Sequence, residues 1–283
     1  MFVIIGFVVV FGSFIGGFMI AGGNPVLLIQ ISEFITILGV AFGSLLIMTP
    51  FPNVLKIIKS VIKLFSAKHS SKEGNMKLLK ALYELFLVAQ REGLLAIEKH
   101  IEDPASSEVF KHDEHLLKNP IALTFLTDTL KVMLSGGVPP HEIEALMDTE
   151  IETFEAETKP LGHTLQTFGD SFPGIGIVAA VLGIIITMSS INEGAEVVGH
   201  HVAAALVGTF LGVLIAYGFV GPLAANMGHM YEDEARYLGT IKAAVVAYAK
   251  GNPPIVAVEI ARRTLYSDAR PTFSELESYL RGK

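Results

Sequence analysis

The chain contains no cysteine and no tryptophan among its 283 residues. Without cysteine it can form neither disulfide bonds nor thiolate metal sites. Charged residues are also scarce, at 17%, where a soluble domain usually carries about 25%. Hydrophobic residues make up 51% of the chain, and the net charge of −7 gives no sign of nucleic-acid binding. This composition is typical of a membrane protein.

Basic residues are missing from two long stretches of the chain. No Lys or Arg precedes Lys56, and none lies between Lys159 and Arg236. The 21 basic residues therefore fall into 56–159 and 236–283. The two stretches without them are also the most apolar, which indicates two membrane blocks alternating with two polar regions.

The apolar blocks are long enough for four membrane-spanning helices, since one span needs about 20 mostly apolar residues. The predicted spans are 2–21, 33–49, 172–191 and 201–227. Short connections join them in pairs. No strand pattern or internal repeat interrupts the helical periodicity elsewhere. We therefore expect an all-α membrane protein with four transmembrane helices in two hairpins and a helical cytoplasmic domain.

The distribution of lysine also predicts the orientation. Neither short connection, 22–32 or 192–200, contains Lys or Arg, whereas several lysines follow the second span closely. By the positive-inside rule both polar regions and both termini face the cytoplasm, in a multi-pass inner-membrane protein. The expected domains are a first transmembrane hairpin, a cytoplasmic helical domain, a second transmembrane hairpin lining an ion path, and a cytoplasmic C-terminal helical region: 1–49, 50–169, 170–227 and 228–283.

The polar regions show helical periodicity. A helix is predicted over 76–101, and on it Arg91 and Glu98 would share one face because they are about two turns apart. A second helix, 119–136, begins with the N-cap Asn119 followed by proline and ends at a pair of glycines. A third, 139–158, is strongly acidic, and such a face is either solvated or a docking surface. The tail adds a helix over 230–251.

Ionisable groups are absent from the deep parts of all four spans. Glu33 and Asp170 are expected near span ends. Ion carriers usually place such a group within the membrane. Either the chain is not a transporter, or a partner helix brings the carboxylate.

Small residues recur at helical spacing in the second hairpin. Such faces let helix backbones approach closely in lipid. They serve either packing within this chain or contact with other subunits or a guest helix, and both readings stay open. The residues are Gly176, Ala179, Ala180 and Gly183 on the third span and Ala204, Gly208, Gly212 and Ala216 on the fourth.

Prolines and polar side chains mark the same two spans. Pro173 and Pro222 stand near their cytoplasmic ends, where they either begin a helix or kink it. Thr209 and Tyr217 are the main polar groups of the fourth span. Thr209 either bonds to its own backbone or lines an ion path. No metal-binding or enzymatic motif is present, so we expect no metal, no cofactor and no enzyme activity.

Together these stretches resemble the MotA stator proteins of the bacterial flagellar motor. The resemblance covers nearly the whole chain and is most specific in five segments. They are "REGLLAIE" (91–98), "EIEALMDTEIE" (142–152), "GDSFPGIGIVAAVLG" (169–183), "HVAAALVGTFLGVLIAYGFVGPLA" (201–224) and "PPIVAVEIARRTLYSDARPTF" (253–273). The membrane segments alone are also similar to the related ExbB and TolQ proteins, which typically have three spans.

The resemblance implies an assembly and residue roles. Five copies would surround two copies of a single-span MotB-like partner whose membrane aspartate carries the ion. The cytoplasmic domain would push the rotor protein FliG through Arg91, Glu98 and Glu150. The ion path would run past residues of the second hairpin, namely Asp170, Pro173, Ala180, Thr209, Tyr217 and Pro222.

The resemblance also bears on the translocated ion. Sodium-driven relatives tend to carry hydroxyl residues where this chain has Ala180 and Gly208, so protons are expected. Two other functions remain open at this stage. One is a force-transducing subunit of the ExbB and TolQ kind that energises an outer-membrane system, and the other is a membrane scaffold without ion traffic.

Overall fold

The computed structural model describes residues 2–66, 71–111 and 113–282, which are helical with no strand among them. The chain divides into two compact units. Residues 1–67 and 158–230 form one, the membrane unit, and residues 68–157 and 231–283 form the other, the polar unit. Two long helices, α8 (Pro140–Ser189) and α10 (Gly221–Ala249), each contribute to both units.

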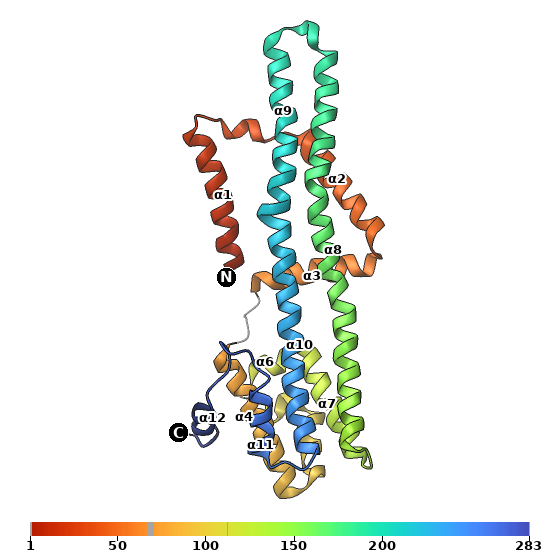
Figure 1. Cartoon of the computed structure of the whole chain (residues 1–283), viewed down its shortest axis with the longest axis vertical. Helices are drawn as coiled ribbons and strands as arrows, with labels where there is room; N and C mark the ends of the chain where they lie inside the picture. Colours follow the sequence, from red (N-terminus) through yellow and green to blue (C-terminus); the bar gives the residue numbers. More distant parts are fainter. Residues whose placement is uncertain (1, 67–70, 112, 283) are drawn as a thin grey trace. The chain divides into compact units, whose positions relative to one another are not determined.

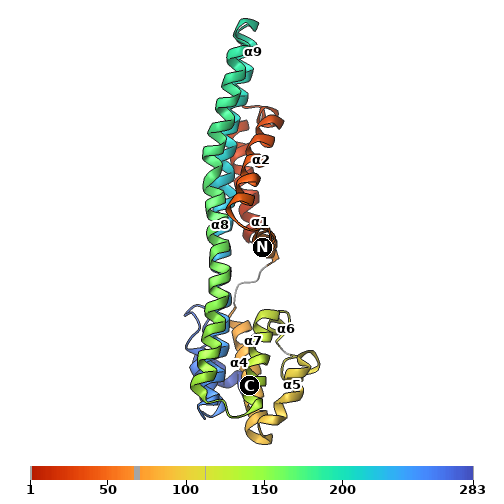
Figure 2. The same cartoon turned by 90° about the vertical axis from the view of Figure 1, so that its right-hand side faces the viewer.

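The membrane unit contains four apolar helical segments long enough to cross a bilayer, as predicted. The first two are α1 (Phe2–Ile20) and α2 (Ile31–Met48), joined through the short helix η1 (Pro25–Leu28). The apolar part of α8 turns through η4 (Ile191–Glu193) into α9 (Ala195–Leu214), and the two run side by side (Figures 1 and 2).

The core of the membrane unit lies where α2 crosses the α8–α9 pair. Ile37 and Ala41 of α2 are almost completely buried there. They belong to one apolar cluster with residues of α8, of α9 and of the segment that follows α9, namely Phe172, Ile175, Ala179, Val207, Leu211 and Ala216. Helix α1 has no buried residue. It contacts the unit through aromatic rings, such as Phe11 against Phe219 with centroids 4.8 Å apart.

A further helix of the membrane unit, α3 (Phe51–Ser66), runs crosswise to these spans in Figure 1. Its residues Val54, Ile57 and Leu64 are buried. Its three lysines are Lys56, Lys59 and Lys63, and it contains no acidic residue. The helix is therefore amphipathic, with one face packed on the protein and another carrying positive charge.

The polar unit is a bundle of helices around its own apolar core (Figure 2). Phe86, Phe110 and Phe125 are its largest fully buried side chains. Its helices, besides the polar parts of α8 and α10, are α4 (Lys72–Glu92), η2 (Leu94–Ile97), α5 (Glu98–Glu102), η3 (Pro104–Ser106), α6 (Glu114–Leu117), α7 (Pro120–Ser135), α11 (Pro254–Arg262) and α12 (Phe273–Leu280).

One predicted helix of the polar unit is confirmed in detail. Helix α7 begins at Pro120, and the Asn119 side chain accepts a hydrogen bond from the backbone N–H of Ala122 at 3.2 Å. It ends before Gly136, whose φ of +79° favours glycine. Cap and stop signals thus determined both ends of this helix.

The prediction of one helix over 76–101 is wrong beyond Glu92. Helix α4 ends at Glu92, because Gly93 adopts φ +89° and breaks the helical backbone. The chain then continues through the 3-10 helix η2 into the short α5. Arg91 and Glu98 therefore lie on two different helices, not on one helical face.

The second hairpin also differs from its prediction, because its helices are longer. The acidic helix 139–158 and the third span are one continuous helix, α8, with Pro160 and Pro173 inside it. The fourth span passes through one π-helical turn, Ile215–Val220, into α10. Pro222 follows this turn and lacks an N–H donor, so the preceding carbonyls must pair differently. The N–H of Gly221 accordingly donates to the carbonyl of Ala216, five residues back.

Candidate functional site

Glycines bring α8 and α9 into backbone contact at the predicted small-residue face. A Cβ atom placed on Gly176 would lie 2.7 Å from the carbonyl oxygen of Gly208. A Cβ on Gly212 would lie 2.5 Å from the carbonyl oxygen of Phe172. A Cβ on Gly183 would lie 2.8 Å from the side chain of Ala205. Only glycine fits at these positions without displacing backbone.

The small residues therefore serve packing within this chain, which was one of the two readings of the sequence. Ala179 is 1% exposed. Its Cβ lies 3.3 Å from the place that a Cβ on Gly208 would occupy. Ala204, one turn before, is half-buried. A contact of these residues with another subunit remains a prediction.

The predicted ion-path residues differ in burial and lie on α8, on α9, in the π-helical turn after α9 and on α10. Ala180 is buried, Pro173 and Thr209 are half-buried, and Pro222 is exposed. Tyr217 is 68% exposed although it belongs to a span. The Cα of Thr209 would be 3.3 Å from a Cβ on Gly176, so Thr209 flanks the close contact.

Asp170 is exposed on α8, one turn before the apolar run begins. Its carboxylate accepts a hydrogen bond of 2.9 Å from the side-chain amide of Gln166. This placement agrees with the expected position near the end of a span, where a carboxylate keeps its charge at little cost.

The burial of Glu33 was not predicted from the sequence. It stands in the first turn of α2, yet it is only 6% exposed. Its Oε2 occupies the notch left by Gly208, 2.5 Å from where a Cβ of that residue would be. Among the described residues this oxygen has no hydrogen-bond partner. A buried carboxylate inside a membrane unit is by default a functional candidate.

An uncharged surface remains on the outer side of the α8–α9 pair. Large apolar side chains there stay exposed, because nothing in the described part of the chain covers them. They include Ile177, Val181 and Ile184 on α8 and Leu206 and Val213 on α9. Such a surface must face lipid or another apolar helix.

The predicted rotor-facing residues all belong to the polar unit and are exposed. Arg91 lies in the last turn of α4 and Glu98 begins α5, on either side of the Gly93 break. Glu150 lies on α8, where partial burial, and then the charge of Asp128, raises the pKa of its carboxyl. Neither Arg91 nor Glu98 forms an ion pair among the residues that the structure describes.

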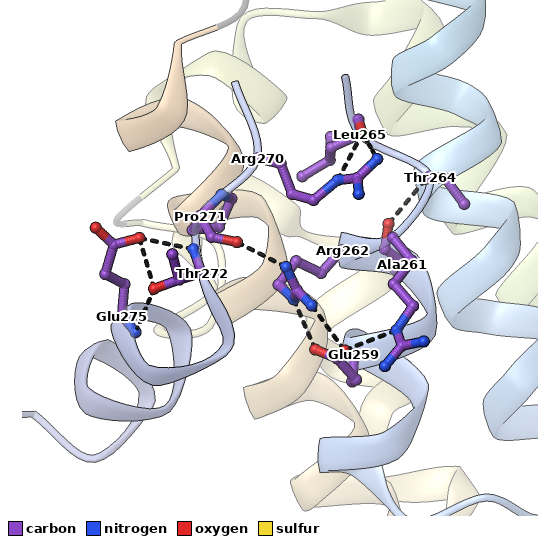
Figure 3. A network of polar contacts seen from close by, with 10 residues as sticks. Glu259, Ala261, Arg262, Thr264, Leu265, Arg270, Pro271, Thr272 and Glu275 are labelled. Atoms are coloured by element: carbon purple, nitrogen blue, oxygen red, sulfur yellow. Dashed lines mark hydrogen bonds and ion pairs between the residues drawn. The ribbon is translucent and has the colours of Figure 1, made fainter. Parts of the chain in front are cut away.

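The C-terminal segment of the resemblance folds into a compact network around Glu259 (Figure 3). The carboxylate of Glu259 accepts two hydrogen bonds from Arg262, at 2.6 and 2.8 Å, and one from Arg263, at 2.9 Å. These donors lower the pKa of Glu259, Arg262 most of all. Arg262 also donates to the carbonyl of Pro271 at 2.8 Å, so it ties α11 to the segment leading into α12.

A second acidic residue of the polar unit, Asp113, is buried. Asp113 is 1% exposed, and its Oδ1 caps α6 by accepting from the N–H groups of His115 and Leu116. Its Oδ2 has no partner among the described residues, and neither has the hydroxyl of buried Tyr237. Burial raises the pKa of the Asp113 carboxyl, and both burial and Asp113 raise the pKa of Tyr237.

We predict that Asp113→Asn stabilises the polar unit in a pH-dependent way. The folded pKa of Asp113 lies above its ordinary value of 3.8, so the native state loses stability as the pH rises from that ordinary value through the raised pKa, and the full penalty of the ionised form applies above it. The variant keeps the cap oxygen but removes the buried charge. Its thermal midpoint should exceed that of the wild type at pH 8, with the difference shrinking towards pH 4. A difference in thermal midpoint that does not change with pH would contradict this explanation. Asp113→Ala loses the cap oxygen and should therefore be less stable than the wild type at every pH in this range.

No group of three or more His, Cys, Asp or Glu side chains in the described part of the chain could hold a metal ion. His112 lies outside the described residues.

Comparison with known proteins identifies the class to which this architecture belongs. Residues 114–239 match the family model described as the MotA/TolQ/ExbB proton channel family. Residues 4–93 match the model described as Motility protein A N-terminal.

Curated relatives and solved structures agree with these matches. The chain is 37% identical to Motility protein A of Escherichia coli strain K12, over 99% of this chain and 95% of that protein. It is 35% identical to the chemotaxis protein LafT of Vibrio parahaemolyticus, over 94% and 93%. Its fold resembles a chain of C. jejuni MotAB, with a TM-score of 0.79 at 22% identity over 94% of this chain and 96% of that one.

A chain of the Bacillus subtilis flagellar MotAB stator complex has the same fold, with a TM-score of 0.75 at 23% identity over 95% and 98% of the two chains. The chain belongs to the motility protein A family, the multi-span subunits of flagellar stators, within the MotA/TolQ/ExbB class. The match to the N-terminal motility protein A model covers the first hairpin, so the ExbB and TolQ alternative is not favoured.

Proposed function

We propose that this chain is the ion-path and torque-transmitting subunit of a flagellar stator, and that a single-span MotB-type partner supplies the ion-carrying carboxylate. The observation that carries the proposal is the uncovered apolar surface of the α8–α9 pair. It lies beside Thr209 and Tyr217, while the apolar runs of those helices contain no Asp, Glu, Lys or Arg. A guest helix fits such a surface, and its carboxylate would supply the charge that these spans lack.

The assembly we propose has five copies of this chain around two copies of the partner, in the inner membrane. The large polar unit and both termini face the cytoplasm, as the lysines of α3 favour. There the exposed charges of Arg91, Glu98 and Glu150 contact the rotor protein FliG. Ion flow past the partner carboxylate turns the ring, and the chain itself catalyses no chemical reaction.

We propose that the translocated ion is a proton. Sodium requires several oxygen ligands in place of its water shell. Ala180, Gly176 and Gly208 offer no side-chain oxygen. Near this contact the side-chain oxygens are those of Thr209 and Glu33, which is few for a dehydrated sodium ion. A proton needs only one titratable carrier and a path of hydrogen-bonding groups.

Glu33 is predicted to take part in this path rather than only in packing. Glu33→Gln keeps the shape of the side chain in the Gly208 notch but cannot bind or release a proton. We expect the variant to assemble normally and to swim several-fold more slowly, while Glu33→Asp keeps part of the speed. The measurement is swimming speed together with the amount of complex in the membrane. If Glu33→Gln swims like the wild type and Glu33→Asp does not, the carboxyl serves packing alone.

Complementation tests the proposed function as a whole. A motile host that lacks its own stator genes should regain swimming when this chain is expressed with its MotB-type partner, and not when either is expressed alone. Restored activity of an outer-membrane transport system in a strain lacking ExbB, without restored swimming, would instead support the force-transducing alternative.

A further inference from the structure

An open apolar groove runs along α1 in the membrane unit. It has a volume of about 710 Å³ and is lined by one face of α1 and by Phe65 at the end of α3. Gly12 and Gly16 widen it, because nothing lies within 4 Å of a Cβ placed on either residue. Phe7 and Phe65 close one end, with ring centroids 5.6 Å apart. Ile4, Phe11 and Ile15 complete the apolar wall.

Helix α3, whose Phe65 lines that end of the groove, carries exposed apolar and basic side chains along its length. Phe51, Leu55, Ile58 and Ile62 form one stripe at helical spacing and are 60%, 44%, 46% and 64% exposed. Lys56, Lys59 and Lys63 form an adjoining stripe of exposed residues. A helix with this pattern lies in the plane of a membrane surface, with its apolar stripe in the acyl region and its lysines at the headgroups.

The exposed charged side chains within residues 2–66 are all lysines. Glu33 is the only acidic residue among residues 1–72, and it is buried. Lysines at a membrane surface attract anionic lipids, each contributing about 1 kcal/mol. The lysine stripe thus favours a ligand that carries a negative headgroup.

We propose that the α1 groove and the end of α3 form a binding site for an anionic phospholipid. An acyl chain occupies the groove beside Phe11, Gly12 and Gly16, and the headgroup lies at the level of α3 near Lys59 and Lys63. The groove spans Ile4 to Gly16, which is about 18 Å of helix. One leaflet of a bilayer core is about 15 Å thick, so the groove matches a single acyl chain in one leaflet.

A second copy of this chain fits the site less well than a lipid. The same surface of another copy has no exposed acidic residue to pair with the lysines. The groove also has no polar atom that a protein backbone or side chain would need to satisfy, since its lining is entirely apolar apart from glycine. This site is separate from the proposed ion path, so its test does not depend on motility.

Native mass spectrometry of the intact complex, extracted from membranes in mild detergent, tests the site. The wild-type complex should retain phosphatidylglycerol in preference to phosphatidylcholine when offered equal amounts of both. Gly16→Leu fills the groove and should lose the bound lipid. The control is Gly17→Leu, one residue along the same helix, which does not line the groove and also has open space around it.

A second pair of variants tests the headgroup contact without touching the groove. Lys59→Gln with Lys63→Gln should reduce the preference for phosphatidylglycerol about tenfold or more. The matched control is Lys99→Gln with Lys118→Gln in the polar unit, which removes the same charge and should leave the preference unchanged. Equal retention of the two lipids by the wild type, or unchanged retention in both Gly16→Leu and the lysine pair, overturns the proposal.

Crosslinking distinguishes a lipid from a protein in the groove. Because the chain has no cysteine, Gly12→Cys introduces a single thiol. We expect this thiol to form no crosslink to another copy or to the partner. An efficient crosslink between two protein chains at this position would assign the groove to protein and overturn the lipid site.

Discussion

Replacing Gly176 with valine is expected to abolish motility by preventing assembly of the second hairpin. The Cβ alone would lie 2.7 Å from the carbonyl oxygen of Gly208 and 3.1 Å from the Cα of Gly212. These are backbone atoms, so relief requires α8 and α9 to separate along their whole contact. Overpacking of this kind usually lowers the free energy of unfolding by about 1–3 kcal/mol. We expect the upper end of this range, because the backbone atoms in contact cannot move aside as a side chain can.

The control for this variant lies two residues earlier on the same helix. Gly174→Val has nothing within 4 Å of the new Cβ and carries the same intrinsic helix propensity. The amount of folded complex in the membrane should fall strongly for Gly176→Val and stay near wild type for Gly174→Val. Equal amounts of complex for both variants would show that the close α8–α9 contact is not required for assembly.

Reversing the charge of Arg91 is expected to abolish or strongly reduce swimming while leaving the complex assembled. Arg91 is exposed at the end of α4, and among the described residues no carboxylate pairs with it. Arg91→Glu therefore removes no internal contact, and surface substitutions of this kind usually change stability by less than about 0.5 kcal/mol. Its effect should appear in a contact with another protein, where like charges repel.

Swimming speed, the amount of membrane complex and the thermal midpoint together test this prediction. Lys99→Glu, another exposed basic residue of the polar unit, serves as the control for the change in charge. If Arg91→Glu also lowers the thermal midpoint or the amount of complex, Arg91 has a folding role instead. Because Glu98 begins a separate helix, Glu98→Lys is expected to reduce swimming independently rather than through the same helical face.

The sequence predicted the spans because lipid imposes a simple rule of length and apolarity. It also predicted the ends of α7, because a capping Asn119 and the Gly136 stop act locally. The break at Gly93 was missed, since the surrounding apolar residues continue a helical spacing. Only the backbone, with φ of +89° there, shows that α4 stops.

The continuous α8 was missed for the opposite reason. Composition changes from acidic to apolar along it, and Pro160 and Pro173 are signals that usually end a helix. Helical backbone can nevertheless continue through both, so one element enters two units. Glu33 does lie near a span end, in the first turn of α2, as predicted. Its burial was not predicted, because burial depends on the contact between α2 and α9, a tertiary contact that no local pattern encodes.

The dependence of swimming on the ion gradient tests the central claim most directly. The complementing strain, in which this chain and its partner drive the only stator, is tracked while sodium concentration and a protonophore are varied. We expect speed to be independent of sodium at constant ionic strength and to fall to zero when the protonophore collapses the proton gradient. Speed that rises with sodium and survives the protonophore would contradict a proton path built on Ala180, Thr209 and Glu33.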